Sequence, residues 1–192
     1  MKTLFYAAFL ALLLLTLDAS AITTMAVSLD GPDWRIAADP GNTGRENNWF
    51  NGPTQDAAAA RVPGALQEFL PGAHGVIWYW RTFDAPAMPF DKGRYLLRFG
   101  AVDYLAEVWV NDTNVGGHEG SETPFTLDVT SAILPNAANR IAVRVLNPTN
   151  TPIDGIVLGQ TAHRNKNERL TVGGSYNVGG INEIRNIDVV NT

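Results

Sequence analysis

Runs in which apolar residues alternate with polar ones fill the middle of the chain, and this period of two predicts half-buried β-strands. In residues 94–99 (RYLLRF), three apolar residues fall on one face, whereas Arg94 and Arg98 fall on the other. Residues 76–83 (VIWYWRTF) are apolar on both faces. Further strands are predicted at 106–110 (AEVWV), 125–129 (FTLDV), 141–146 (IAVRVL) and 184–190.

The first third of the chain is richer in loop-forming residues. Residues 22–75 contain many Gly, Pro, Asn and Asp, which predicts an opening strand followed by long loops. Residues 56–60 (DAAAA) give a weak helical signal within this part. Residues 111–114 (NDTN) tolerate a left-handed backbone, so they predict a hairpin loop after the strand at 106–110.

Six or more short strands without a long amphipathic helix or a βαβ alternation predict an all-β protein. Two packed antiparallel sheets, a β-sandwich, are the architecture that this pattern favours. The pattern alone leaves the wiring open between an immunoglobulin-like sandwich and a jelly roll.

Residues 1–21 have the features of a signal peptide. Lys2 precedes an apolar run over residues 4–17 that is too short to span a bilayer, and Ala19-Ser20-Ala21 supplies small residues for cleavage. We expect cleavage before Ile22, a single domain over 22–192, no membrane association after cleavage, and a secreted or periplasmic location. The alternative is an uncleaved N-terminal anchor.

Amino-acid composition argues against several classes of function. The chain has 192 residues, a formal net charge of −5 and no cysteine. The acidic balance argues against a nucleic-acid partner. The absence of cysteine excludes disulfides, thiolate metal sites and a cysteine nucleophile.

Several features occur together and in order. They are an aromatic-Arg-x-Phe strand within residues 78–86 (WYWRTFDAP), Val-Trp-Val-Asn at 108–111, His118 before Gly120, Pro124-Phe125 with Asp128, Asn139-Arg140, and Gly179-Gly180-Ile181. Together these features resemble the N-terminal sugar-binding domain of glycoside hydrolase family 2, the family of β-galactosidases, β-glucuronidases and β-mannosidases. The resemblance covers residues 78–86 and 94–148, and extends over about 62–190. It implies a jelly roll of the galactose-binding type, carbohydrate as a partner, and a glycosidase catalytic barrel in cis in the parent protein.

The same resemblance implies that catalysis lies elsewhere. Retaining glycosidases use two carboxyl groups about 5–5.5 Å apart, and the family places both on a (β/α)₈ barrel, which needs about 250 residues. We therefore expect no catalytic residue in this chain and no hydrolysis by it alone, although the parent would be a retaining β-glycosidase. We interpret Asn167-Glu168 and Asn182-Glu183, which echo the family's Asn-Glu dipeptide, as coincidences.

Other chemistry has little support in the sequence. His74, His118 and His163 lack metal-ligand spacing, so neither a metal nor a cofactor is expected. Acidic residues such as Asp103, Glu107 and Asp128 are expected to be solvated or to form turns.

The aromatic residues and His118 each allow two interpretations. Trp78, Trp80 and Trp109 are either a carbohydrate platform or core residues, and their position within strands favours the core. His118 is either a ligand or a hydrogen-bonded turn residue, and we expect the latter.

The resemblance implies sugar contacts in one polar region. Residues 163–168 (HRNKNE) and 175–178 (SYNV) match family loops that reach the barrel's active site, and Val178 departs from the polar or aromatic residue usual there. The alternative is an exposed polar loop without a ligand. The predicted sugar-binding residues are Asn165, Asn167, Tyr176 and Asn177.

The function expected from the sequence is a non-catalytic sugar-binding accessory domain of a family-2-like β-glycosidase. An autonomous secreted carbohydrate-binding module is the first alternative. A structural adhesion domain is the second, because sandwich folds serve many roles.

Overall fold

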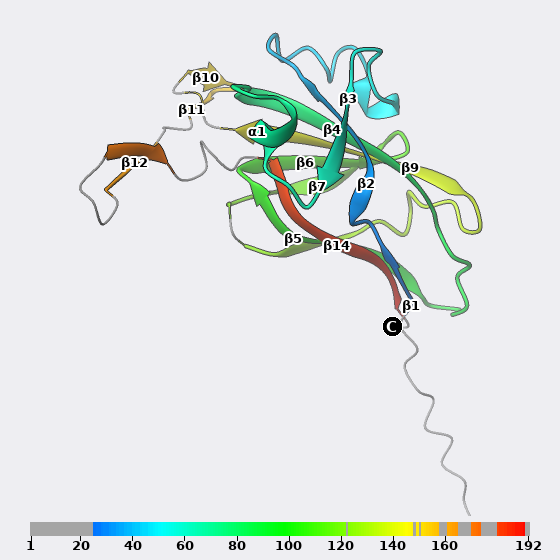
Figure 1. Cartoon of the computed structure of the whole chain (residues 1–192). Helices are drawn as coiled ribbons and strands as arrows, with labels where there is room; N and C mark the ends of the chain where they lie inside the picture. The colour runs from blue at the N-terminus through cyan, green and yellow to red at the C-terminus, as the bar shows by residue number, and fades with distance from the viewer. Residues whose placement is uncertain are drawn as a thin grey trace, which may run out of the picture.

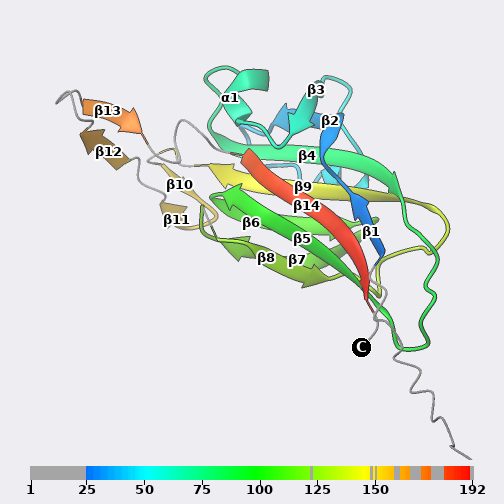
Figure 2. The ribbon, with the colours of Figure 1, turned by 60° about the horizontal axis from the view of Figure 1, so that its bottom comes forward.

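A computed structural model describes residues 25–121, 123–147, 149, 151–157, 161–164, 170–173 and 180–190. Of these, 157, 161–164, 170–173 and 180–186 are described by their backbone alone. Two antiparallel sheets face each other, as Figures 1 and 2 show. The predicted β-sandwich is therefore confirmed.

The larger sheet has six strands in the order β3-β2-β4-β9-β6-β7. Its strands are β2 (Gly31–Ala38), β3 (Ala58–Val62), β4 (Gly75–Asp84), β6 (Leu105–Val110), β7 (Thr113–Glu119) and β9 (Ala138–Asn147).

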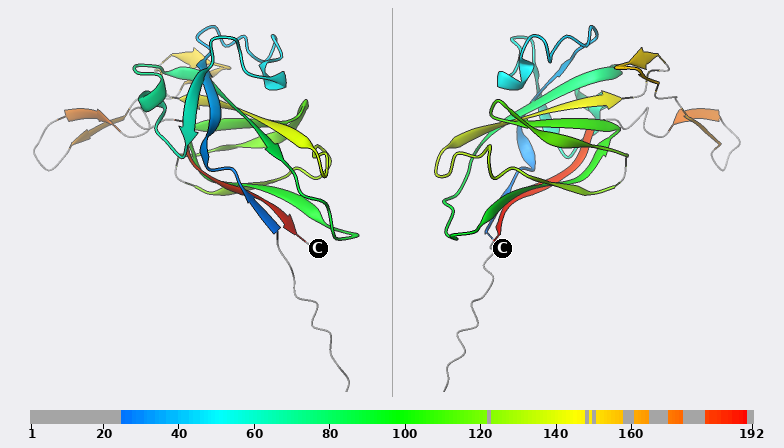
Figure 3. Two further views of the ribbon diagram at one scale, coloured as in Figure 1. Left: turned by 45° about the vertical axis from the view of Figure 1, so that its right-hand side comes forward. Right: turned by 180° about the vertical axis from the view of Figure 1, so that it is seen from behind.

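The smaller sheet has four strands in the order β1-β14-β5-β8. Its strands are β1 (Met25–Ser28), β5 (Arg94–Asp103), β8 (Phe125–Asp128) and β14 (Gly180–Val190). Because β14 pairs with both β1 and β5, the last strand of the described chain lies inside the sheet, and Figure 3 shows it running beside β1.

Short elements complete the described chain. The β10–β11 hairpin (Pro152–Ile153 and Ile156–Val157) packs against the outer face of the six-stranded sheet through Ile153 and Asp154. The β12–β13 hairpin (Thr161–Arg164 and Leu170–Gly173) lies beyond one end of the sandwich in Figure 2. The helical elements are η1 (Trp49–Asn51) and α1 (Leu66–Phe69). Among the described residues, neither these nor any other helix is long and apolar enough to cross a bilayer.

The main core lies between the two sheets and consists of side chains that alternate along the strands. On β5, Tyr95, Leu97 and Phe99 are buried as predicted, and on β9 the inward residues Ile141, Val143 and Val145 are inaccessible to solvent. The alternation that predicted these strands therefore also gives the correct inner face.

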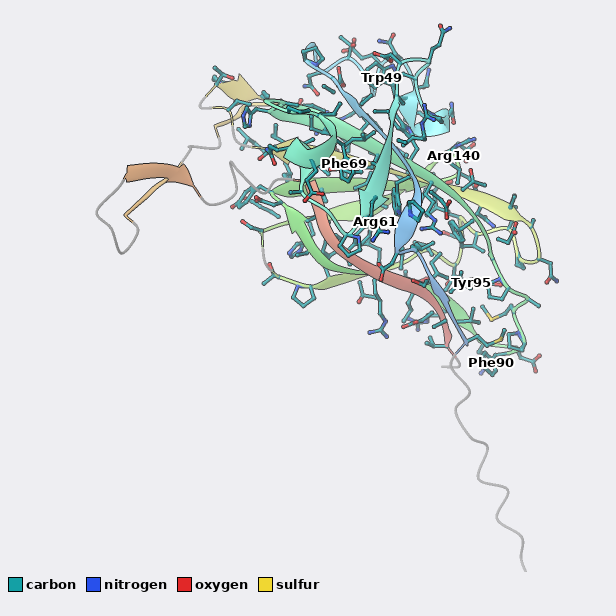
Figure 4. All side chains as sticks on the ribbon, viewed as in Figure 1. Trp49, Arg61, Phe69, Phe90, Tyr95 and Arg140 are labelled. Carbon is teal, nitrogen blue, oxygen red and sulfur yellow. The ribbon has the colours of Figure 1, made fainter. Side chains whose placement is uncertain are left out.

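A second core covers the outer face of the six-stranded sheet. Residues 39–57 arch over this face in Figures 1 and 3, and Trp49 on this segment packs against the sheet. Figure 4 shows Trp49 on the opposite side of the molecule from Tyr95 of the four-stranded sheet. The sheet is thus buried on both faces, which explains why β4 is apolar on both faces. The buried members of this second core are Ala37, Ala57, Val76, Trp78, Trp80, Trp109, Ala142 and Leu146.

The helical signal at residues 56–60 is wrong. Alanine has the highest helix propensity, but residues 58–60 belong to β3 and pair with β2 in the register Ala60 with Trp34, Ala59 with Arg35 and Ala58 with Ile36. Small side chains suit this site because Ala57 and Ala60 are buried against the two cores.

An amide side chain fixes the corner where β9 begins. Asn139 is 1% exposed, and its Nδ2 donates to the carbonyls of Leu134 and Ala137, each at 2.8 Å. Its Oδ1 accepts from the backbone N–H of Leu134 at 2.8 Å and from Nδ2 of Asn111 at 3.0 Å. Asn111 itself has φ 56°, so the β6–β7 turn uses the left-handed backbone that the sequence predicts, although β7 already begins at Thr113.

Candidate functional site

The predicted sugar-binding residues lie outside the described residues. Asn165 and Asn167 follow β12, and Tyr176 and Asn177 precede β14, so the sugar-contact prediction remains a prediction. The described chain shows only the strands that flank these positions. In those strands, His163 pairs with Thr171 and Arg164 with Leu170.

The three tryptophans of the central strands are core residues, as expected. Trp78, Trp80 and Trp109 are 0, 1 and 6% exposed. Their ring centroids are 5.2 Å apart for Trp78 and Trp109 and 6.3 Å apart for Trp78 and Trp80. The indole N–H of Trp78 donates to Asp39 Oδ2 at 3.1 Å, and that of Trp80 donates to the carbonyl of Trp49 at 2.6 Å. These rings present no open face to a sugar.

His118 has the structural role that the sequence favours, although it lies in β7 rather than in a turn. Its ring stacks on Phe125 with centroids 4.5 Å apart. Its Nε2 lies 3.1 Å from Oγ1 of Thr123. The contact joins β7 to the loop that precedes β8.

The expectation for the acidic residues is wrong at Asp103 and Glu107. Asp103 is completely buried, and Glu107 forms ion pairs on the covered outer face of the six-stranded sheet. Asp128 is a turn former, as predicted, because its Oδ1 accepts from the backbone N–H and the hydroxyl of Thr130 at 3.1 and 2.6 Å. The hydroxyl hydrogen bond is the largest cause that lowers the pKa of Asp128.

An open depression of about 450 Å³ lies on the outer face of the six-stranded sheet, at the β6–β7 edge. The register of β6 and β7 places Leu105 opposite Glu119 and Glu107 opposite Gly117, so these residues form its floor. Residues 39–57 and the β10–β11 hairpin supply the two sides. The lining residues are Arg45, Leu105, Ala106, Glu107, Gly117, His118, Glu119, Asp154 and Ile156.

A charged network holds one side of the depression in place. The Arg144 side chain is completely buried, and it donates to Glu107 Oε2 at 2.9 Å, to Asp154 Oδ2 at 2.7 Å and to Asn42 Oδ1 at 2.6 Å. Arg45, which is 39% exposed, donates through Nε to the same Glu107 oxygen at 3.0 Å and through Nη2 to Asp154. Each carboxylate is therefore shared by two guanidinium groups.

The network keeps Asp154 ionised. Burial alone would raise the pKa of Asp154, but the hydrogen bond from Asn42 and the charges of Arg144 and Arg45 outweigh it and lower the pKa. A carboxylate held in this form cannot supply a proton at neutral pH. Asp154 is therefore suited to accepting hydrogen bonds rather than to general acid catalysis.

Two features shape the floor. A Cβ at Gly117 would lie 2.1 Å from the carbonyl oxygen of Ala106, so only glycine permits the close approach of β7 to β6. At the rim, the hydroxyl of Tyr104 donates to Glu119 Oε1 at 3.1 Å, and this hydrogen bond is the largest cause that raises the pKa of Tyr104. No group of three or more His, Asp or Glu side chains arranged to hold a metal occurs among the described residues.

The two-layered antiparallel fold, with an additional core on one outer face, is that of a β-sandwich domain of the galactose-binding type. Residues 26–182 match the family described as "Glycosyl hydrolases family 2, sugar binding domain". The chain therefore belongs to glycosyl hydrolase family 2, of which it contains the sugar-binding domain.

Relatives agree with this assignment. The chain is 35% identical to a β-glucuronidase of Paenibacillus borealis over 122 residues, which cover 61% of this chain and 20% of that protein. It is 32% identical to a β-glucuronidase of Felis catus over 146 residues, covering 67% and 22%. The chain thus spans about a fifth of the length of these relatives.

Solved structures show the same fold. A β-glucuronidase of Ruminococcus gnavus in complex with uronic isofagomine matches with a TM-score of 0.69 at 23% identity, over 87% of this chain and 29% of that one. A β-glucuronidase of an uncultured Clostridium species matches with a TM-score of 0.68 at 26% identity, over 88% and 29%. Among the described residues of this chain, the fold is the sandwich alone, without a (β/α)₈ barrel.

Proposed function

We propose that the chain is the accessory domain of an exported β-glucuronidase-like glycosidase, in which it packs beside a catalytic barrel and helps to position substrate. The observation that carries this proposal is the family match over residues 26–182, together with relatives that are β-glucuronidases. The substrate class is a β-linked glycoside, and hydrolysis takes place on the barrel.

The features of residues 1–21 support export. Lys2, the apolar run at 4–17 and Ala19-Ser20-Ala21 form the three successive parts of a signal peptide. The absence of cysteine is compatible with an oxidising compartment, because no thiol is present there to react. Fractionation of cells that express the full chain, with N-terminal sequencing of the product, tests both export and cleavage before Ile22.

A domain exchange tests the proposed function. The matching segment of the Paenibacillus borealis β-glucuronidase is replaced by residues 22–192 of this chain, and hydrolysis of a nitrophenyl β-glucuronide is measured. We expect the chimera to hydrolyse the substrate, whereas the isolated chain and the relative without its N-terminal segment do not. A soluble, folded chimera without activity would contradict the proposal.

A further inference from the structure

We propose that the depression at the β6–β7 edge is a binding site for a neutral saccharide, separate from the predicted loop contacts at residues 165–177. The choice of a saccharide as the ligand rests on the proposed function. The proposal goes further in giving this domain a ligand of its own, bound at a site assembled from β6, β7, Arg45 and the β10–β11 hairpin.

The dimensions of the depression suit one or two sugar units. Ligand sites are typically clefts of about 300–1,000 Å³, and this one measures about 450 Å³. It is open along the edge of the sheet, so a longer glycan chain can extend beyond it. Gly117 keeps the floor low, since β7 lies too close to β6 there for any side chain.

Hydrogen-bonding groups surround this space in fixed positions. Glu107 forms its ion pairs through Oε2, and within the described part of the chain its Oε1 makes no hydrogen bond. Glu119 is held by Tyr104, and Arg45 is held by two carboxylates while still 39% exposed. Prepositioned carboxylates accept hydrogen bonds from sugar hydroxyls, and a guanidinium donates to sugar oxygens.

Apolar side chains provide a second kind of contact. Ile156 is one of only a few large hydrophobic residues that are exposed among the described ones, at 38%. It lines the depression together with the half-buried Leu105. Polar walls combined with aliphatic side chains match a pyranose, whose hydroxyls project outward and whose C–H groups form apolar faces.

The charges select a neutral ligand. The carboxylates of Glu107, Glu119 and Asp154 outnumber the guanidinium groups of Arg45 and Arg144. A uronate would bring a further negative charge close to these groups, and like charges are unfavourable at short range. The site therefore differs in specificity from a uronic-acid site.

Two substitutions probe the site without breaking the charged network. Ile156→Glu removes an exposed apolar contact, and Glu119→Gln removes a charge while leaving an acceptor for Tyr104. Leu134→Glu is the matched control, because Leu134 is 55% exposed and lies before β9, whereas Ile156 lies after it. Circular dichroism and urea unfolding are used to check that all three variants keep the fold.

The full chain is titrated calorimetrically with cellotetraose, mannotetraose, xylotetraose and galactotetraose, and with tetragalacturonate as the acidic probe. We expect at least one neutral tetrasaccharide to bind with a Kd of about 1 mM or below, and each site variant to weaken it about tenfold. Leu134→Glu should leave the Kd unchanged, and tetragalacturonate should bind at least about tenfold more weakly.

Three results would overturn the inference. The first is that no neutral probe binds at about 10 mM. The second is that neither Ile156→Glu nor Glu119→Gln weakens the binding of a neutral tetrasaccharide. The third is that tetragalacturonate binds as tightly as the neutral tetrasaccharides. The domain-exchange chimera distinguishes failure of the saccharide site from failure of the proposed function. If a chimera that carries both substitutions is active while no saccharide binding is found, only the saccharide site at the β6–β7 edge is refuted.

Discussion

Asp154 Oδ2 lies 2.7 Å from Nη2 of Arg144, whose side chain has no solvent exposure. This pair joins the β10–β11 hairpin to the centre of the six-stranded sheet, since Arg144 is on β9. Burying a guanidinium group is costly unless it is paired. The position of the hairpin is therefore coupled to the neutralisation of Arg144.

Replacing Asp154 with alanine is expected to lower the free energy of unfolding by about 2 kcal/mol, because hydrogen bonds to charged groups are lost while Arg144 stays buried. Urea unfolding followed by tryptophan fluorescence measures the change. Glu46→Gln is the matched control, because Glu46 is exposed on the same loop as Arg45. An equal effect of the two substitutions would contradict this role for Asp154.

The network also predicts a pH dependence. The pKa of Asp154 is lowered in the folded protein, whereas the pKa of an unfolded aspartate is about 3.9. On acidification, the unfolded state therefore takes up a proton before the folded state does. The stabilisation by Asp154 is present above about pH 4 and is lost as the pH falls through the folded pKa. Asp154→Asn should therefore differ from wild type in urea midpoint at about pH 6, and the difference should shrink as the pH is lowered below about 3.9. A difference that stays constant over this range would show that ionisation of Asp154 is not involved.

Gly44 is expected to be essential for closing residues 39–57 over the tryptophans. A Cβ there would lie 2.5 Å from Nε1 of Trp78 and 2.7 Å from Oδ2 of Asp39. Gly44→Ala should destabilise the protein by about 1–3 kcal/mol through overpacking, and the emission of the buried tryptophans should shift to the red. At Gly41 an added Cβ meets only Thr43 at 3.5 Å, so Gly41→Ala should be nearly neutral.

At the start of β9, Asn139 satisfies the backbone N–H and carbonyl of Leu134, and it shares the carbonyl of Ala137 with the backbone N–H of Ala85. Asn139→Ala leaves the two Leu134 groups unsatisfied and is expected to cost about 1–3 kcal/mol. Thermal unfolding of this variant is compared with that of Asn51→Ala, an exposed asparagine of η1. A similar loss from both variants would argue against a structural role for the Asn139 amide.

The predicted loop contacts are tested in the domain-exchange chimera. Asn165→Ala, Asn167→Ala, Tyr176→Ala and Asn177→Ala are each expected to raise KM for a nitrophenyl β-glucuronide about threefold to tenfold, as lost hydrogen bonds to substrate would. Glu46→Gln is again the control. Kinetics that are unchanged in all four variants would favour a loop without a ligand.

Local pattern predicted the strands in which apolar residues alternate, but it missed β3 and β7 and did not show what covers the sheets. The period of two gives the inner faces of β5 and β9 correctly, because one side of each strand packs against the opposite sheet. The ion pair of Glu107 with Arg45 depends on residues 39–57 folding back over the six-stranded sheet. Such long-range coverage leaves no periodic signal near the residues that it buries.

The alanines at residues 58–60 show a case in which local propensity is overridden. Their intrinsic propensity favours a helix, yet pairing with β2 places them in a strand, since tertiary contacts outweigh differences of a few tenths of a kcal/mol per residue. The depression was likewise not predicted. Arg45, Glu107 and Asp154 are more than 45 residues apart in sequence, and none belongs to a motif, so only the folded chain brings them together.

The internal position of β14 also determines when the domain can be completed during synthesis. The strand lies between β1 and β5, although it is made after both. Until residue 190 has left the ribosome, β1 has no neighbour and β5 keeps an open edge beside apolar core residues. Exposed edges of this kind promote association between chains. Fragments that end before Gly180 should therefore aggregate, and the nascent domain should depend on chaperones until its final eleven-residue strand is in place.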